Sequence, residues 1–294
     1  MRSETCLKSI LLYAAIVLFS SGYAMADTWT TLDNVTPRGI SGDNIVGSGA
    51  GDMGFLYNMN TKTWTTLNPI GATRSDAYGI NGNKIVGQYW DTSTTWGLGF
   101  LNDGTSWTTL VAPAGDFDRR STCLRGISGD NIVGYDQQEQ GFLYNATNQN
   151  WTKLHYPGAL NTLPMGIDGS NIVGYYYYAG TFNGFLYNGT TWTPLTMQGV
   201  QSWGTYVTGI SGNNIVGYYE RGADHGFLYD GTTWTTLDYP GATSTQIYGI
   251  SDNSVVGYYE DSSGVDHGFI YTIPEPATLL LLGLGAVIAR RKRS

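Results

Sequence analysis

The sequence predicts an all-β fold, a six-bladed β-propeller, on three observations. First, a repeated unit fills most of the chain, and its glycine-led head recurs at spacings of 40, 47, 40, 43 and 40 residues. Second, each unit holds four short β-prone pieces separated by turn-forming residues. Third, the repeated region begins with the tail of a unit and ends with a unit that lacks its tail. The six heads are marked by Gly39, Gly79, Gly126, Gly166, Gly209 and Gly249.

The four pieces of a unit are clearest in the fifth copy. They are a stretch up to Gly209-Ile210, then "NIVGYY", then "HGFLYD" and then "TWTTLDY". The segment Ser-Gly-Asn-Asn suits a four-residue hairpin loop, and Asp230-Gly231 suits a tight turn with positive φ. Nothing between the two chain ends has helical periodicity. Four strands in about 40 residues is the size of a propeller blade; a β-sandwich or an open β-solenoid is the alternative.

The ends of the repeated region predict how the ring closes. A Trp-Thr-x-Leu tail follows five heads, but the sixth unit ends at "GFIYTIPEP" without one. The missing tail stands at residues 29–32, ahead of the first head. We therefore expect residues 29–32 to form the outer strand of the sixth blade, which removes the exposed end of an open array. The five tails begin at Trp64, Trp107, Trp151, Trp192 and Trp234.

Residue choice within the unit agrees with stacked blades. "NIVG" and "GFLY" are continuously apolar, as expected for inner strands covered on both faces. The outer piece mixes Trp and Leu with Thr, which keeps a free edge polar. A second set of recurring glycines is expected to allow close approach where the wedge-shaped sheets converge. These glycines are Gly47, Gly87, Gly134, Gly174, Gly217 and Gly257.

The N-terminal residues 1–26 read as a cleavable signal peptide. Arg2 and Lys8 precede an apolar run at 10–19, and Ala24 and Ala26 supply small residues at the cleavage positions. The apolar run is too short for a comfortable membrane span, which takes about 20 residues. We expect cleavage after Ala26, so that residues 27–272 form the repeat domain.

Residues 273–294 form a three-part tail. Pro274, Glu275 and Pro276 lead into an uncharged stretch at 277–289, and a basic cluster follows. Thirteen helical residues span about 20 Å, short of a hydrocarbon core near 30 Å, so we expect transient insertion into the inner membrane. The basic end should stay cytoplasmic, which leaves the repeats on the outer side. The cluster consists of Arg290, Arg291, Lys292 and Arg293.

This tail resembles the PEP-CTERM sorting signal of Gram-negative bacteria. The resemblance covers 273–294, where the motif, the apolar helix and the basic cluster stand in that order. It implies cleavage by an exosortase near the Pro-Glu-Pro motif and delivery to the cell surface or an exopolysaccharide matrix. An ordinary tail anchor is the alternative. The repeat also resembles the extracellular HAF-type repeat, through "DHGFLYDG", "GIS", "IVG" and "GFLY", which again implies an extracellular location.

Charge and residue content limit the binding partners, disulfides and cofactors that we expect. Residues 27–276 keep 9 of the 15 basic and 22 of the 23 acidic residues, a balance of 9 − 22 = −13. This acidic balance argues against nucleic acid as a partner. Cys123 is the single cysteine of that region, so no internal disulfide is expected. The sequence shows no zinc spacing or calcium loop, and the glycine-rich letters at 49–54 precede strands rather than a helix. We therefore expect no metal and no cofactor.

Departures from the repeat give the candidate binding residues. The loops between the second and third strands and between units should share one face, whereas short turns occupy the other. Aromatic rings beside charged groups on such loops are typical of carbohydrate recognition. The repeated tyrosine pairs at 218–219 and 258–259 and the Asp-His-Gly histidines, His225 and His267, are expected to serve packing and turns. The candidates are Trp90, Trp96, Asp116, Asp118, Arg119, Arg120, Tyr176, Tyr177, Tyr178 and Trp203.

The sequence thus predicts an exported, non-enzymatic protein of the cell surface or exopolysaccharide matrix, without catalytic residues. A carbohydrate-binding module that uses the aromatic loops is the second hypothesis. A propeller glycoside hydrolase is the third, with Asp116 and Asp118 as an acid/base pair.

Overall fold

The computed structural model describes residues 28–49, 51–115, 117–118, 121–197 and 203–274. One compact unit comprises Trp29–Tyr271. The signal peptide, the site residues Asp116, Arg119 and Arg120, and the tail from Glu275 onward lie outside the described residues. In the described part, no helix is long and apolar enough to cross a membrane.

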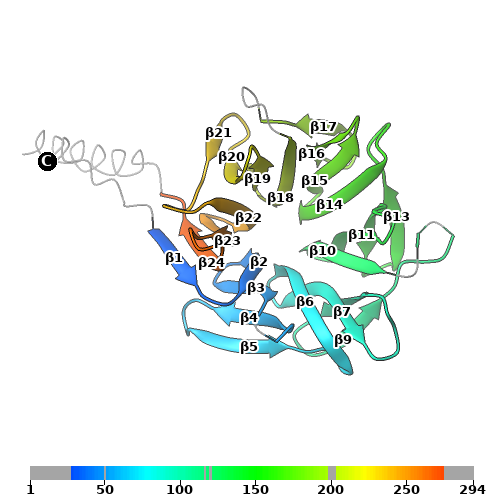
Figure 1. The fold of residues 1–294 in the computed structure, drawn as a ribbon. Helices are drawn as coiled ribbons and strands as arrows, with labels where there is room; N and C mark the ends of the chain where they lie inside the picture. The colour runs from blue at the N-terminus through cyan, green and yellow to red at the C-terminus, as the bar shows by residue number, and fades with distance from the viewer. Residues whose placement is uncertain (1–27, 50, 116, 119–120, 198–202, 275–294) are drawn as a thin grey trace, which may run out of the picture. The chain divides into compact units, whose positions relative to one another are not determined.

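Twenty-four strands in the described residues form six four-stranded blades around a central axis (Figure 1). The innermost strands are β2 (Thr36–Ser41), β6 (Ala72–Asn81), β10 (Thr122–Ser128), β14 (Asn161–Asp168), β18 (Gly204–Ser211) and β22 (Ser244–Ser251). The second strands are β3 (Asn44–Ser48), β7 (Lys84–Asp91), β11 (Asn131–Asp136), β15 (Asn171–Tyr178), β19 (Asn214–Glu220) and β23 (Ser254–Glu260). The third strands are β4 (Gly54–Asn58), β8 (Leu98–Asn102), β12 (Gly141–Asn145), β16 (Thr181–Tyr187), β20 (Asp224–Tyr229) and β24 (Asp266–Thr272). The outer strands are β5 (Thr63–Leu67), β9 (Trp107–Leu110), β13 (Asn150–Leu154), β17 (Trp192–Leu195), β21 (Trp234–Thr236) and β1 (Thr28–Leu32).

The predicted fold class is confirmed, including the closure of the ring. The sixth blade has the order β1-β24-β23-β22, so the first strand of the chain is the outer strand of the last blade (Figure 1). Every other blade takes its four strands from consecutive chain. The fourth and fifth blades also touch through a single parallel pair, Phe182 with Gly204, which joins them into one hydrogen-bonded sheet.

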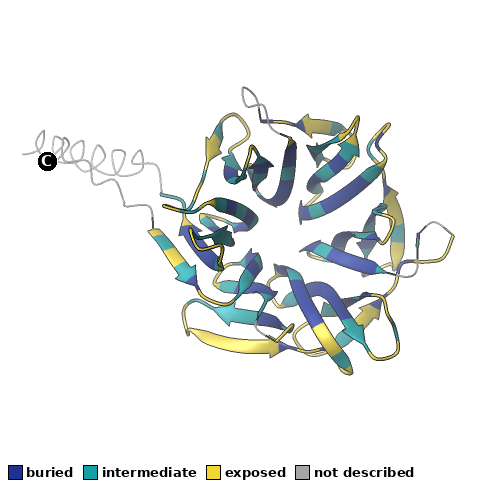
Figure 2. Ribbon diagram, viewed as in Figure 1, coloured by how far each residue is buried: buried dark blue, intermediate teal, exposed yellow. Residues whose placement is uncertain are grey.

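The core lies between the faces of neighbouring blades, while the outer strands are largely exposed (Figure 2). The phenylalanine of each "GF" piece is buried, from Phe55 to Phe269. It meets the tryptophan of its own blade's outer strand at 4.9–5.2 Å between ring centroids. In the sixth blade Trp29 makes this contact with Phe269, at 5.1 Å. The exchanged strand β1 therefore packs on its blade as the outer strands of the other five blades do.

A β-bulge interrupts every innermost strand next to its head glycine. In the third blade, for example, the register with β11 jumps between Leu124 and Gly126, so Arg125 has no cross-strand partner. The same jump recurs in the other five blades. A bulge bends the strand and re-aims the extra side chain. The six bulge residues all line the central channel: Arg38, Tyr78, Arg125, Met165, Thr208 and Tyr248.

The glycines of the second strands do not mark the convergence of the sheets, which corrects the sequence prediction. A Cβ on Gly47 would lie 2.1 Å from the Thr36 carbonyl oxygen of the same blade, because that carbonyl belongs to the bulged strand beside it. The sheets converge at the head glycines instead. A Cβ on Gly39 would lie 2.7 Å from the carbonyl oxygen of Tyr78 and 3.3 Å from the Cα of Gly79.

Polar contacts also join neighbouring blades around the axis. At the turn after each innermost strand, a backbone N–H donates to the side chain that ends the previous blade's innermost strand, at 2.7–3.1 Å. The series includes the junction of last and first blades, where Gly42 N donates to Ser251 Oγ at 3.1 Å. The junction that closes the ring thus has the same hydrogen bond as the five junctions between blades that follow one another in the chain.

Candidate functional site

Strand order gives the ring two unlike faces. Loops from second to third strands and from one blade to the next emerge on one face, here called the loop face. The short turns from first to second and from third to fourth strands emerge on the other. The seven candidate binding residues that the structure describes belong by topology to segments of the loop face.

Trp90 and Trp96 flank the same loop but differ in setting. Trp90 lies near the end of β7, and the guanidinium carbon of Arg74 stands 4.6 Å from its ring centroid. Arg74 also pairs with Asp76 at 3.0 Å. One face of the Trp90 ring is therefore occupied. Trp96 lies between β7 and β8 with 39% of its surface exposed, and its carbonyl accepts a hydrogen bond from Thr94.

The segment between the second and third blades is anchored by a buried ring. Phe117 packs edge-on against Phe142, at 5.8 Å between centroids. The backbone N–H of Asp118 donates to Asp136 Oδ2 at 2.7 Å. The acid/base hypothesis needs the distance between the carboxyl groups of Asp116 and Asp118. Asp116 lies outside the described residues, so this pair stays a prediction.

The four-tyrosine run at the end of β15 divides into buried and exposed rings. Tyr176 stacks on Tyr156 at 3.7 Å, with an angle of 7° between ring planes, and is buried. Burial raises the pKa of its hydroxyl well above the ordinary value. Tyr177 packs against Phe182 at 5.0 Å. Tyr178 is exposed, so it is the ring of this run that a ligand can reach.

Trp203 is the most exposed candidate, at 67% of its surface. Its backbone is fixed, because its N–H donates to the Glu220 carbonyl at 2.9 Å and its own carbonyl accepts from Thr181 Oγ1 at 2.6 Å. The structure therefore presents the rings of Trp96, Tyr178 and Trp203 on the loop face.

The central channel holds a ring of side chains that sequence reasoning missed. A cavity of about 30 Å³ is lined by the six bulge residues alone, and a second cavity of about 70 Å³ is lined by these residues together with the head glycine and the following isoleucine of each blade. Among the six bulge residues, Arg38 and Arg125 carry a positive charge. Each guanidinium lies over the tyrosine of the preceding blade, Arg38 over Tyr248 at 4.1 Å and Arg125 over Tyr78 at 4.0 Å. The sequence did carry one signal of this ring: the residue before the head glycine differs between copies, whereas the rest of the head is repeated.

Further tyrosines of the third to fifth blades lie next to the bulge residues on their loop-face side. Arg125 donates to the hydroxyl of Tyr135. Burial raises the pKa of Tyr175 to about 12 and the pKa values of Tyr78 and Tyr218 further. These hydroxyls are therefore neutral at physiological pH and serve as hydrogen-bond groups.

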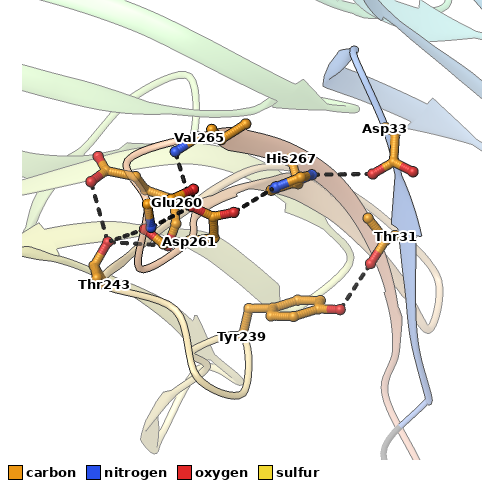
Figure 3. A network of polar contacts seen from close by, with 9 residues as sticks. Thr31, Asp33, Tyr239, Thr243, Glu260, Asp261, Val265 and His267 are labelled. Atoms are coloured by element: carbon orange, nitrogen blue, oxygen red, sulfur yellow. Dashed lines mark hydrogen bonds and ion pairs between the residues drawn. The ribbon is translucent and has the colours of Figure 1, made fainter.

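The two Asp-His-Gly histidines lie in strands, which corrects their assignment to turns. His225 Nδ1 contacts Asp238 at 2.8 Å, and His267 Nδ1 contacts Asp33 at 3.1 Å. His267 Nε2 also contacts Asp261 at 3.1 Å (Figure 3). Among the described residues, no cluster of His, Cys, Asp or Glu has an arrangement that could hold a metal ion.

Comparison with known proteins identifies the C-terminal tail. A sequence model of the PEP-CTERM protein-sorting motif matches residues 272–293. The chain carries a PEP-CTERM sorting motif. Such a motif marks an exported protein that an exosortase processes for the cell surface. No curated protein sequence matches the chain.

Solved structures share the propeller fold at low identity. The β-propeller domain of the Trilobed protease from Pyrococcus furiosus is 12% identical, with a TM-score of 0.51 over 82% of this chain and 94% of that one. TolB from Acinetobacter baumannii is 11% identical, with a TM-score of 0.50 over 81% and 63% of the two chains. The Pyrococcus horikoshii acylaminoacyl peptidase is 12% identical, with a TM-score of 0.50, and this chain spans 47% of it. These matches establish a shared fold, and a shared fold does not carry an activity.

Proposed function

We propose that the protein is a non-enzymatic propeller displayed at the cell surface or in an exopolysaccharide matrix after exosortase processing. One observation carries the proposal. The last strand of the ring, β24, ends at Thr272, and the Pro-Glu-Pro motif begins two residues later at Pro274. Cleavage near that motif removes the tail without removing a strand. The released ring is closed, so it has no end blade with an uncovered face.

Fractionation of the producing cells tests the sorting step. The wild-type protein is expected in the surface or extracellular fraction. A variant with Ala at Pro274, Glu275 and Pro276 is expected to stay in the inner membrane, because the exosortase no longer recognises its tail. Equal release of both proteins would contradict exosortase sorting, and retention of both would favour a plain tail anchor.

Carbohydrate binding by the loop face is the second candidate function, favoured by the exposed rings of Trp96, Tyr178 and Trp203. A flat aromatic ring covers the apolar face of a sugar, and neighbouring polar groups fix its hydroxyls. Because the backbone of Trp203 is held by two hydrogen bonds, binding need not order this part of the loop.

A polysaccharide array tests this candidate. Trp96→Ala with Trp203→Ala is expected to reduce glycan binding at least about ten-fold, with a melting temperature within about 2 °C of wild type. The matched control is Ile70→Ala with Leu160→Ala, which removes two exposed apolar side chains without aromatic rings from the same face. Equal losses in both variants, or no loss in the tryptophan variant, would argue against stacking.

A further inference from the structure

Two arginines of the central channel form no ion pair with a described carboxylate. Arg38 and Arg125 occupy bulge positions of the first and third blades, and no ion pair joins either of them to a described acidic residue. Nearby Asp76 is committed elsewhere, since it pairs with Arg74 and accepts a hydrogen bond from Ser48 at 2.6 Å. Two cations without an ion-pair partner among the described residues thus line one channel. Residues 27–276 as a whole carry a charge balance of −13.

One of these guanidinium groups also has an unsatisfied donor. The Nε atom of Arg38 is buried and lacks a hydrogen-bond partner in the structure. A buried N–H without an acceptor is costly and calls for a missing partner such as an ion or a ligand. The stacking of Arg38 on Tyr248 holds the group in place, so its donors are fixed before any ligand arrives.

The cavity between the two arginines restricts the size of the group that enters. The cavity lined by the bulge residues alone has a volume of about 30 Å³, and the cavity that extends to the isoleucines has about 70 Å³; both suit a carboxylate or a few water molecules and are too small for a sugar ring. The rest of a ligand must therefore stay on the loop-face side of the bulge residues. There the Tyr135 hydroxyl accepts a hydrogen bond from Arg125. Tyr206 contacts both Tyr175 and Tyr218, and Tyr218 lies 6.3 Å from Tyr248 between ring centroids. Glu220 ends β19 on this side, whereas Asp224, which begins β20, already accepts a hydrogen bond from Gln246.

We propose that this central pocket binds the carboxylate of a uronic acid, either free or at the end of a polysaccharide chain. Arg38 and Arg125 hold the carboxylate, since guanidinium groups match its planar geometry and stay charged. The tyrosines contact the apolar face of the sugar, and the carboxylate of Glu220 accepts a hydrogen bond from one of its hydroxyls. This site is separate from the loop tryptophans, so the two proposals fail independently.

Titration calorimetry on the exported protein tests the assignment, with D-glucuronate as the probe. D-glucose is the matched neutral sugar, propionate the carboxylate without a sugar, and inorganic phosphate and sulfate the other anions. Glucuronate is expected to bind one-to-one and at least about ten-fold tighter than each of them. Binding no tighter than glucose, equal binding of propionate, or tighter binding of phosphate or sulfate would overturn the proposal.

Variants locate the site. Arg38→Gln with Arg125→Gln is expected to weaken glucuronate binding at least about ten-fold, whereas Arg221→Gln, which removes an exposed arginine from the same face, leaves it unchanged. Met165→Phe is a second test, because it fills the cavity and keeps both guanidinium groups. Trp96→Ala with Trp203→Ala should retain glucuronate binding. Wild-type affinity in the arginine variant, or in a folded Met165→Phe variant, would place the ligand elsewhere.

Discussion

His267 lies between two carboxylates at the loop-face side of the sixth blade, with Asp261 at Nε2 and Asp33 at Nδ1 (Figure 3). Asp33 directly follows β1, the exchanged strand, so this contact helps to hold the closure. Hydrogen bonds to Asp261 first and to Asp33 second raise the pKa of His267 above its ordinary value. His225 has a carboxylate on one side, Asp238, and serves as an internal comparison.

The raised pKa of His267 predicts a pH-dependent stability. A group that binds its proton more tightly in the folded state stabilises the fold fully below its ordinary pKa of about 6.5. This contribution is lost as the pH rises through the higher folded pKa. The melting temperature of wild type should therefore fall over that interval more than that of His267→Asn. Thermal unfolding at a series of pH values measures this difference, and His225→Asn is the control; parallel curves for wild type and His267→Asn would contradict it.

Individual residues can be predicted from the sequence to different degrees. Trp96, Tyr178 and Trp203 were singled out because they interrupt the repeat, and the structure shows them exposed, whereas their role in binding stays a prediction. Arg38 and Arg125 were missed, since a β-bulge turns them toward the axis and no local sequence pattern announces it. The burial of Tyr176 against Tyr156 was also hidden, because the two rings belong to different strands and loops.

At the scale of the element, the exchanged strand β1 decides whether the ring is closed. Trp29 contacts Phe269 at 5.1 Å, Tyr271 at 4.4 Å and Tyr239 at 5.2 Å between centroids. Thr31 Oγ1 and the Tyr239 hydroxyl share a hydrogen bond of 2.8 Å (Figure 3). These contacts tie β1 both to its own blade and to the chain that enters that blade.

Removal of Trp29 tests the strand exchange. Trp29→Ala is expected to lower the free energy of unfolding by about 2–4 kcal/mol, because it deletes a half-buried ring packed on a buried phenylalanine. Trp107→Ala, in the covalently continuous second blade, is the matched comparison, since Trp107 meets Phe100 at a similar 5.2 Å. Urea denaturation measures both values. A loss in Trp107→Ala with none in Trp29→Ala would show that β1 does not complete the sixth blade.

The elements themselves follow closely from the sequence. Each unit's four pieces become four strands, and the fifth blade has them at Gly204–Ser211, Asn214–Glu220, Asp224–Tyr229 and Trp234–Thr236. Periodic turn residues fixed these divisions. The prediction assigned the convergence of the sheets to the second-strand glycines, whereas the head glycines carry it, because both sets recur equally often and the distance between backbones is not a property of sequence.

In the whole molecule, six similar blades make a closed ring, and the irregular loops lie on one of its faces. Equivalent hydrogen bonds join all six blade junctions on the turn face. The irregular loops and the exposed rings belong to the opposite face, and the arginine pocket lies in the central channel. Because the ring ends at Thr272 and the sorting motif covers 272–293, folding and sorting use nearly separate segments of the chain.

The intact mass of the protein recovered from outside the cell tests this arrangement most directly. We expect one species that begins near Asp27, and so retains β1, and that ends close to Pro274, Glu275 and Pro276. Such a species holds all six complete blades and lacks the basic tail. A mass that includes Arg290 to Arg293, or one that lacks residues 28–32, would contradict the release of a closed ring.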